Sequence, residues 1–195
     1  APSSRAAAWR ALAIGAGHFA LALAWITQPF LVEADRYGWM SPFALLLTAL
    51  GGALFWALPA LAAHRLGWNR ASRAAALALA LLVSDWLRGW IFTGLPWALT
   101  GHVWIDTPAG QIAAWLGAPG LSALTLAAAL LPVLGSTRRS ITIGAGLSAV
   151  LIALAWGAGL ARLAQPLPPD QPQIIRLVQP NADQTLKWDP FWAPQ

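Results

Sequence analysis

The sequence predicts an all-α membrane bundle of about five transmembrane helices, which leads into the first strand of a water-soluble domain. Hydrophobic residues make up 58% of the chain and charged residues only 10%, whereas about 25% of an average globular protein is charged. The long apolar runs stop at Leu163, and the stretch Ile174–Asn181 then has the pattern of a strand. We therefore expect a transmembrane bundle in residues 1–165 and the start of a soluble domain in residues 166–195.

The first half of the bundle is predicted to contain three spans. Residues 11–32 and 38–64 are uncharged stretches long enough to cross about 30 Å of hydrocarbon as helices. A third span begins near Ala74 but meets Asp85 and Arg88 before apolar residues resume. Thirteen tryptophans against one tyrosine suit helices anchored at two membrane interfaces, although tryptophan could instead fill the core.

The second half is predicted to contain an interrupted span and a continuous one. The break Gly117–Gly120 separates an interfacial or re-entrant piece, about residues 107–116, from a span over residues 121–134. Residues 141–160 form the fifth span. No alternation of period two, internal repeat or low-complexity tract competes with a helical interpretation.

Charged residues fall on opposite sides of these spans. The arginines that precede the first span or join later spans are Arg5, Arg10, Arg65, Arg70, Arg73, Arg138 and Arg139. By the positive-inside rule their side is cytoplasmic, so the chain beyond Arg162 emerges outside, in the periplasm of a Gram-negative cell. The acidic residues, all on or near that outer side, are Glu33, Asp35, Asp85, Asp106, Asp170, Asp183 and Asp189. The net charge of +5 is then a topology signal that faces anionic lipid, and we expect no nucleic-acid partner.

Two segments carry more information than hydropathy. The first, Asp85–Trp97, places Asp85 and Arg88 three residues apart, on one helix face. An ionisable pair at a membrane helix end is costly unless its partners neutralise each other or meet a lipid headgroup. The pair is therefore either a structural salt bridge or a headgroup-facing site, and Gly94–Trp97 is a turn in the interface. The second segment, Leu177–Pro190, is a strand followed by a polar loop.

Both segments resemble the apolipoprotein N-acyltransferases, bacterial inner-membrane enzymes in which a helical bundle carries a periplasmic nitrilase-like domain of α/β/β/α layers. In that family a membrane helix ends in acidic-Trp-Leu-Arg-Gly and a Thr-Gly-Phe-Pro-Trp turn follows. The nitrilase-like domain opens with Val-Gln-Pro-Asn and a Gln-Ser-Leu-Lys-Trp-Asp loop. This sequence departs from the pattern at Asp85, Leu95 and Asp183, where Glu, Phe and Pro are expected.

The resemblance covers all 195 residues but only part of the family's length. It implies that residues 166–195 begin the nitrilase-like domain of a multi-pass inner-membrane protein. Ala1 is not an initiator methionine, and the single predicted strand has no partner strand in the sequence. We therefore expect a fragment that lacks the first membrane helices and most of the catalytic domain.

The resemblance also implies a two-step acyl transfer. A cysteine thiolate, activated by a glutamate base, takes an acyl chain from a phospholipid to give a thioester. The α-amine of a diacylglyceryl-cysteine lipoprotein then attacks the thioester, while a lysine stabilises the developing oxyanion. The implied partners are a phospholipid acyl donor, a diacylated apolipoprotein acceptor and membrane lipids, and we expect no cofactor and no metal.

The catalytic triad implied by the resemblance is absent from this sequence. The chain contains no cysteine, its only glutamate is Glu33, and its only lysine is Lys187. Glu33 lies between two predicted spans and Lys187 in the opening loop, whereas the family's glutamate and lysine belong to later strands. We therefore expect the triad beyond Gln195 and no activity from this chain alone.

The candidate substrate-binding residues are Trp188, Asp85, Arg88 and Trp97. Trp188 matches a family tryptophan near the substrate entrance, where it would pack against an acyl chain; alternatively, it dips into the outer leaflet. His18, alone on an apolar helix, is interpreted as packed or bonded to a carbonyl rather than as a ligand.

Two other function classes stay open. A transporter or flippase bundle would place ionisable groups or paired broken helices near the bilayer midplane, whereas the predicted spans are nearly free of charge. A non-catalytic relative would use the bundle only as an anchor or a lipoprotein-binding platform. The sequence after Gln195 would separate these classes, because an enzyme must supply glutamate, lysine and cysteine there.

Overall fold

The computed structural model describes residues 2–91, 94–166 and 176–178, which are mostly helical and contain no strand. The predicted strand Ile174–Asn181 falls mainly outside these residues, and Trp188 falls wholly outside them. The long helices are α1 (Ser4–Ala22), α3 (Ser41–Leu66), α4 (Arg70–Arg88), α5 (Ala113–Val133) and α6 (Arg138–Leu163). The short elements are η1 (Ala24–Leu31), α2 (Ala34–Tyr37), η2 (Gly38–Met40), η4 (Thr100–Trp104) and η5 (Pro108–Ile112).

Small polar residues begin three of the long helices. The side chain of Ser3 accepts a hydrogen bond from a backbone N–H in the first turn of α1. Asn69 and Ser72 form a reciprocal capping box at the start of α4, and Thr137 and Ser140 form another at the start of α6. These caps satisfy backbone donors that have no partner inside the helix, so they set where each helix starts.

Three stretches of the described chain are long and apolar enough to cross a membrane. They are Ala34–Leu66, Pro108–Val133 and Arg138–Leu163. α1 and η1 meet at an angle of 48° and make a fourth if they are counted as one broken span. α4 is not among them, because Arg70, Arg73, Asp85 and Arg88 all lie within its 19 residues. The helical membrane bundle is therefore confirmed, but the count of five spans is not.

Two predicted spans are interrupted. The span expected over residues 11–32 is bent where α1 ends, and Pro29 lies within the following 3-10 helix η1. The break predicted at Gly117–Gly120 is confirmed, because Gly117 has φ +66° and ψ −177° inside α5. That conformation favours glycine. α6, in contrast, contains the predicted continuous span.

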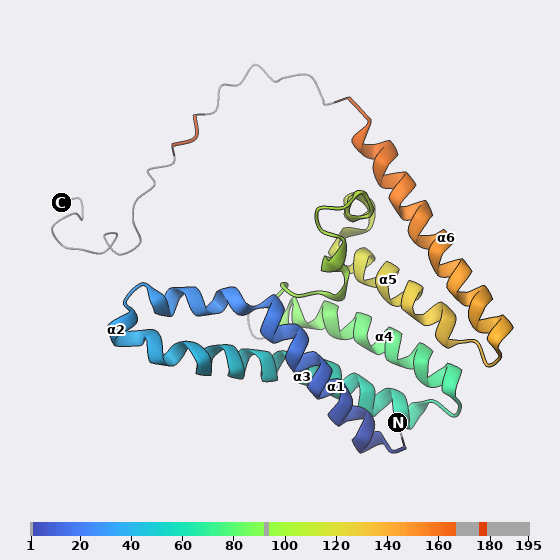
Figure 1. Ribbon diagram of the computed structural model, residues 1–195, viewed down its shortest axis with the longest axis horizontal. Coiled ribbons are helices and arrows are strands. Elements are labelled where there is room, and N and C mark those ends of the chain that lie inside the picture. The colour runs from blue at the N-terminus through green and yellow to red at the C-terminus, as the bar shows by residue number, and fades with distance from the viewer. Residues whose placement is uncertain (1, 92–93, 167–175, 179–195) are drawn as a thin grey trace.

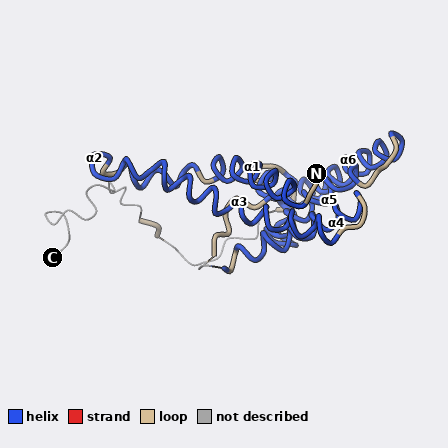
Figure 2. Tube along the Cα trace, turned by 90° about the horizontal axis from the view of Figure 1, so that it is seen from below, coloured by secondary structure: helices blue, strands red, loops and turns tan. Residues whose placement is uncertain are grey.

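The helices α3, α4, α5 and α6 lie next to one another in chain order, and α1 crosses α3 (Figure 1). Figure 2 shows α2 at the tip of an arm that η1 and the first part of α3 also form. The α1–α3 contact is close: a Cβ on Gly52 would lie 2.6 Å from the ring of Phe19, and Gly15 faces Ala53. Small residues let membrane helices approach in this way. The contact brings the last turns of α1 beside the end of α4.

Candidate functional site

A buried polar cluster lies at the end of α4. Asp85 and Arg88 are only 5% and 2% exposed, and Arg88 Nη2 donates to Asp85 Oδ1 across 3.2 Å. Asp85 Oδ2 accepts hydrogen bonds from the Thr100 N–H (3.0 Å), the Thr100 hydroxyl (2.9 Å) and the Ser122 hydroxyl (3.1 Å). The carboxylate therefore ties α4 to η4 and α5. A buried ion pair is stable only when such additional hydrogen bonds complete it.

Arg88 also holds the turn that follows α4. Its Nη1 donates to the carbonyl oxygens of Trp97 and, across 3.4 Å, Leu95, while Nη2 donates to the Ala98 carbonyl across 3.1 Å. Two residues of this turn have positive φ, Gly94 (+86°) and Ala98 (+57°). At Gly94 a Cβ would overlap the backbone at the end of α4. The guanidinium thus fixes a backbone path that only a few residue types adopt readily.

α1 supplies the other side of the cluster. His18 Nε2 lies 3.2 Å from the Ala98 carbonyl oxygen, and because a carbonyl only accepts, Nε2 carries the hydrogen. The imidazole stacks on Trp56 with ring centroids 4.9 Å apart, and the Arg88 guanidinium lies 4.9 Å from the centre of the Phe19 ring. The interpretation of His18 as a packed, carbonyl-bonded residue is confirmed.

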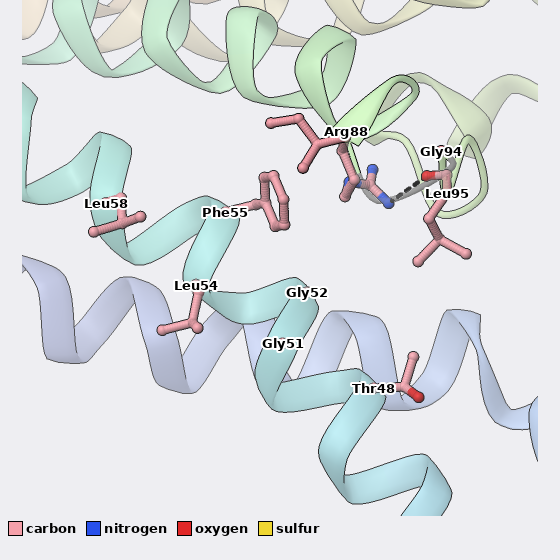
Figure 3. A pocket seen from close by; sticks show the side chains of 10 residues that line it. Thr48, Gly51, Gly52, Leu54, Phe55, Leu58, Arg88, Gly94 and Leu95 are labelled. Carbon is pink, nitrogen blue, oxygen red and sulfur yellow. Dashed lines mark hydrogen bonds between the residues drawn. The ribbon is translucent and has the colours of Figure 1, made fainter.

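An apolar cavity of about 590 Å³ opens between α3 and the end of α4 (Figure 3). Figure 3 shows Arg88 pointing to the turn at Gly94 and Leu95, on the opposite side from Phe55. Among the described lining residues, Thr48 and Arg88 supply the polar side chains, and the rest are apolar or glycine. Such a cavity suits an elongated hydrocarbon group. Among these described lining residues there is no carboxylate, histidine, cysteine or lysine to act as general base or nucleophile.

The structure brings together three of the four predicted site residues. Asp85 and Arg88 form the structural salt bridge that was one of the two predicted alternatives. Trp97 joins them through its carbonyl, and its half-exposed ring lies 5.9 Å from that of Trp25. Trp188 lies outside the described residues. The binding roles of all four stay predictions.

Two hydroxyl residues of the cluster were not predicted. Thr100 and Ser122 come from η4 and α5 and complete the hydrogen bonding of Asp85. Ser122 was visible in the sequence as a polar residue inside a predicted span. Its partner was not, because Asp85 lies 37 residues away along the chain.

Because of His102, which lies in η4 outside the candidate spans, we expect the stability of the protein to depend on pH. Burial lowers the pKa of His102 below its usual value, the positive charge of Arg88 lowers it further, and Asp85 opposes both effects. An unfolded histidine takes up its proton near pH 6.5. Below that pH the unfolded state binds more protons than the folded state, so the free energy of unfolding is expected to fall from about pH 7 to pH 5.

Thermal unfolding in detergent micelles at pH 7.5 and pH 5 measures this effect. In His102→Gln the decrease in melting temperature between the two pH values should be smaller than in the parent. His64→Gln, near the C-terminal end of α3, should show the same decrease as the parent. An unchanged pH dependence in His102→Gln would show that another group is responsible.

Comparison with known proteins agrees with the resemblance drawn from the two segments. Residues 1–131 match the family model described as the apolipoprotein N-acyltransferase N-terminal domain. Proteins named apolipoprotein N-acyltransferase from Caulobacter vibrioides and Allorhizobium ampelinum are 39% and 38% identical over 186 residues, and one from Brucella suis is 35% identical over 193. These alignments cover 95%, 95% and 96% of this chain.

The chain spans about a third of the length of these relatives, since each alignment covers 35% of the relative. No solved structure matches it. A family model that matches two thirds of the chain, together with relatives that align over nearly all of it, leads to one conclusion: the chain belongs to the apolipoprotein N-acyltransferase family.

Proposed function

We propose that this chain is the membrane part of an enzyme that transfers an acyl chain from a phospholipid to the N-terminal diacylglyceryl-cysteine of lipoproteins through a thioester. The observation that carries the proposal is the family match, because 95% of the chain aligns with proteins named apolipoprotein N-acyltransferase. The acyl donor is a phospholipid and the acceptor a diacylated apolipoprotein. A transporter has less support, since the charged cluster lies at a helix end.

The cavity beside the turn is the proposed place for an acyl chain. It has room for a hydrocarbon group, and its walls are formed by α3, the end of α4 and the turn. Asp85 and Arg88 act by holding the turn, because their charged atoms are buried and largely paired with one another and with backbone carbonyls. Trp97 is proposed to lie at the membrane interface beside Trp25, and Trp188, which is outside the described residues, is proposed to contact an acyl chain near the substrate entrance.

The reacting groups lie beyond Gln195. Glu33, the only glutamate, is exposed at the start of α2, and no cysteine is present. Residues 166–195 begin a nitrilase-like domain that supplies glutamate, lysine and cysteine from later segments. The bundle of residues 1–165 alone is therefore inactive and serves to bind and present lipid.

The proposed membrane orientation follows the charges. Arg10 on α1 and Arg70 and Arg73 on α4 line one cavity at one end of the bundle, together with His64 from the end of α3. In the inner membrane that end faces the cytoplasm, and the chain beyond Arg162 faces the periplasm. In this arrangement α4 crosses the membrane between α3 and α5 as the remaining span.

The enzymatic proposal is tested with the complete reading frame that contains this segment. The gene is expressed in a bacterial strain depleted of its own N-acyltransferase, and a diacylated lipoprotein is examined by mass spectrometry. Growth rescue with a triacylated product, lost when the proposed catalytic cysteine becomes alanine, is the expected result. A membrane-inserted protein that yields no acylation would leave the anchor or binding-platform reading.

Filling the cavity should lower acyl transfer in the same assay. Gly51 lines the cavity, and a Cβ at this position meets no atom within 4 Å, so Gly51→Phe projects a ring into the space without a backbone clash. We expect a decrease in acylation rate on the order of tenfold, about 1.4 kcal/mol in barrier height. Gly17→Phe is the matched control, since Gly17 is also unobstructed but lies outside the cavity. Equal activity of both variants would contradict the assignment.

A further inference from the structure

A second cavity, of about 490 Å³, lies at the opposite end of α4 from the polar cluster. It is lined by Arg10 of α1, His64 of α3 and Arg70 and Arg73 of α4. Arg70 and Arg88 are 18 residues apart, or about 27 Å along a helix. The two cavities are therefore separate sites on one bundle.

This second cavity is strongly cationic. Of the acidic residues that the structure describes (Glu33, Asp35, Asp85 and Asp106), none lines it. Arg10 and Arg70 are exposed and form no ion pair within the described residues, while Arg73 Nε donates to the Gly67 carbonyl across 2.9 Å. Several positive charges without a compensating carboxylate favour an anionic ligand.

The cationic cavity continues into an apolar one. A groove of about 220 Å³ between α4 and α5 shares Ala74, Leu77 and Val133 with it, and all of the groove's lining residues are apolar. On α4 the shared lining continues through Ala78 to Leu81, at the i, i+3, i+4, i+7 spacing of one helix face. From Arg70 to Leu81 the helix rises about 16 Å, which is roughly half of the 30 Å hydrocarbon thickness.

We infer that the cationic cavity and the adjoining apolar groove form one binding site for an anionic glycerophospholipid. The phosphate would lie between Arg10, Arg70 and Arg73, and an acyl chain would lie along α4 and α5. Charge and shape support the same occupant: a cationic mouth at the helix ends suits a headgroup, and an apolar groove as deep as one leaflet suits a chain. Basic pockets between transmembrane helices bind lipid headgroups by this physics. The lipid bound here differs from the proposed acyl donor, because it sits at the other end of the bundle.

Lipid binding to the purified full-length protein tests this inference. Native mass spectrometry in detergent compares dioleoyl-phosphatidylglycerol with dioleoyl-phosphatidylcholine, which share acyl chains and differ in charge. The double variant Arg10→Gln/Arg70→Gln should weaken phosphatidylglycerol binding by at least about tenfold, since it removes two direct charge-assisted contacts to the phosphate, each of which contributes about tenfold. It replaces only exposed side chains, so the fold is expected to persist.

The matched control is Arg138→Gln/Arg139→Gln, which removes the same charge at the same end of the bundle from α6, outside both cavities. It should change binding by less than about twofold. An equal loss in both double variants would overturn the site in favour of a general surface potential, as would equal binding of the two lipids by the parent protein.

A further variant tests whether the groove binds the acyl chain of the lipid. Ala78→Phe places a ring in the groove and should weaken phosphatidylglycerol binding, whereas glycerol 3-phosphate, which has no acyl chain, should not compete with the lipid. Competition by glycerol 3-phosphate at a concentration equal to that of the lipid would identify a free phosphate site and overturn the lipid assignment. Lipoprotein acylation by the complete enzyme is measured in parallel, so that failure of this site is distinguished from failure of the proposed function.

Discussion

Replacing Asp85 by alanine is expected to reduce the free energy of unfolding by about 3–5 kcal/mol, the cost of removing one partner of a buried ion pair. The substitution leaves the Arg88 guanidinium buried without a counter-charge. It also leaves the Thr100 and Ser122 groups without their shared acceptor. Reversible unfolding by sodium dodecyl sulfate in mixed micelles, followed by tryptophan fluorescence, measures the change.

Two further variants distinguish the loss of the Asp85–Arg88 ion pair from the general effect of removing an acidic residue. Asp35→Ala, at an exposed acid on α2, should stay within about 0.5 kcal/mol of the parent. Asp85→Leu/Arg88→Met should recover part of the lost stability, because replacing a whole buried pair by apolar groups avoids the unpaired charge. A loss below about 1 kcal/mol in Asp85→Ala would mean that water reaches the pair.

Gly159→Ala is expected to destabilise the docking of α6 by about 1–3 kcal/mol, the usual range for overpacking. A Cβ at Gly159 would overlap the carbonyl oxygen of Pro108 at the start of η5. That obstacle is backbone, which cannot rotate away as a flexible side chain can. α6 must therefore shift away from η5, and the same micellar unfolding experiment should record the loss.

Gly157→Ala is the matched control, two residues earlier on α6. A Cβ there meets no atom within 4 Å, and alanine is about 0.5–1 kcal/mol better than glycine inside a helix. We expect this variant to be as stable as the parent or slightly more stable. Equal behaviour of the two variants would contradict the close approach of α6 and η5.

Local signals predicted the helices well. The break at Gly117 was visible as a Gly-Ala-Pro-Gly run, and the continuous span within α6 as an uncharged stretch. The bend after Ala22 was not predicted, because hydropathy does not distinguish a straight span from α1 followed by the 3-10 helix η1. The status of α4 as a span also stayed open, since its four charged residues lower its hydropathy.

The candidate site was predicted only in part. The spacing of Asp85 and Arg88 placed them on one helix face, and a salt bridge between them was one of two alternatives. Their other partners could not be predicted, because Thr100, Ser122 and the carbonyl of Ala98 come from loops and helices that meet only when the bundle packs. The cationic cavity could not be predicted for the same reason, because its lining residues come from α1, α3 and α4, which are brought together only by helix packing.

By itself, the sequence determined the membrane class, the approximate positions of most helices, the segregation of charge and the family, because these follow from local composition and short motifs. Tertiary structure alone decided that Asp85 and Arg88 are buried and joined to the turn, and that two cavities lie at opposite ends of α4. The physical reason is that a charge can be buried only where partners distant in the chain converge on it. Helix packing sets which partners converge. Small residues on α1 and α3 allow these two helices to pack closely.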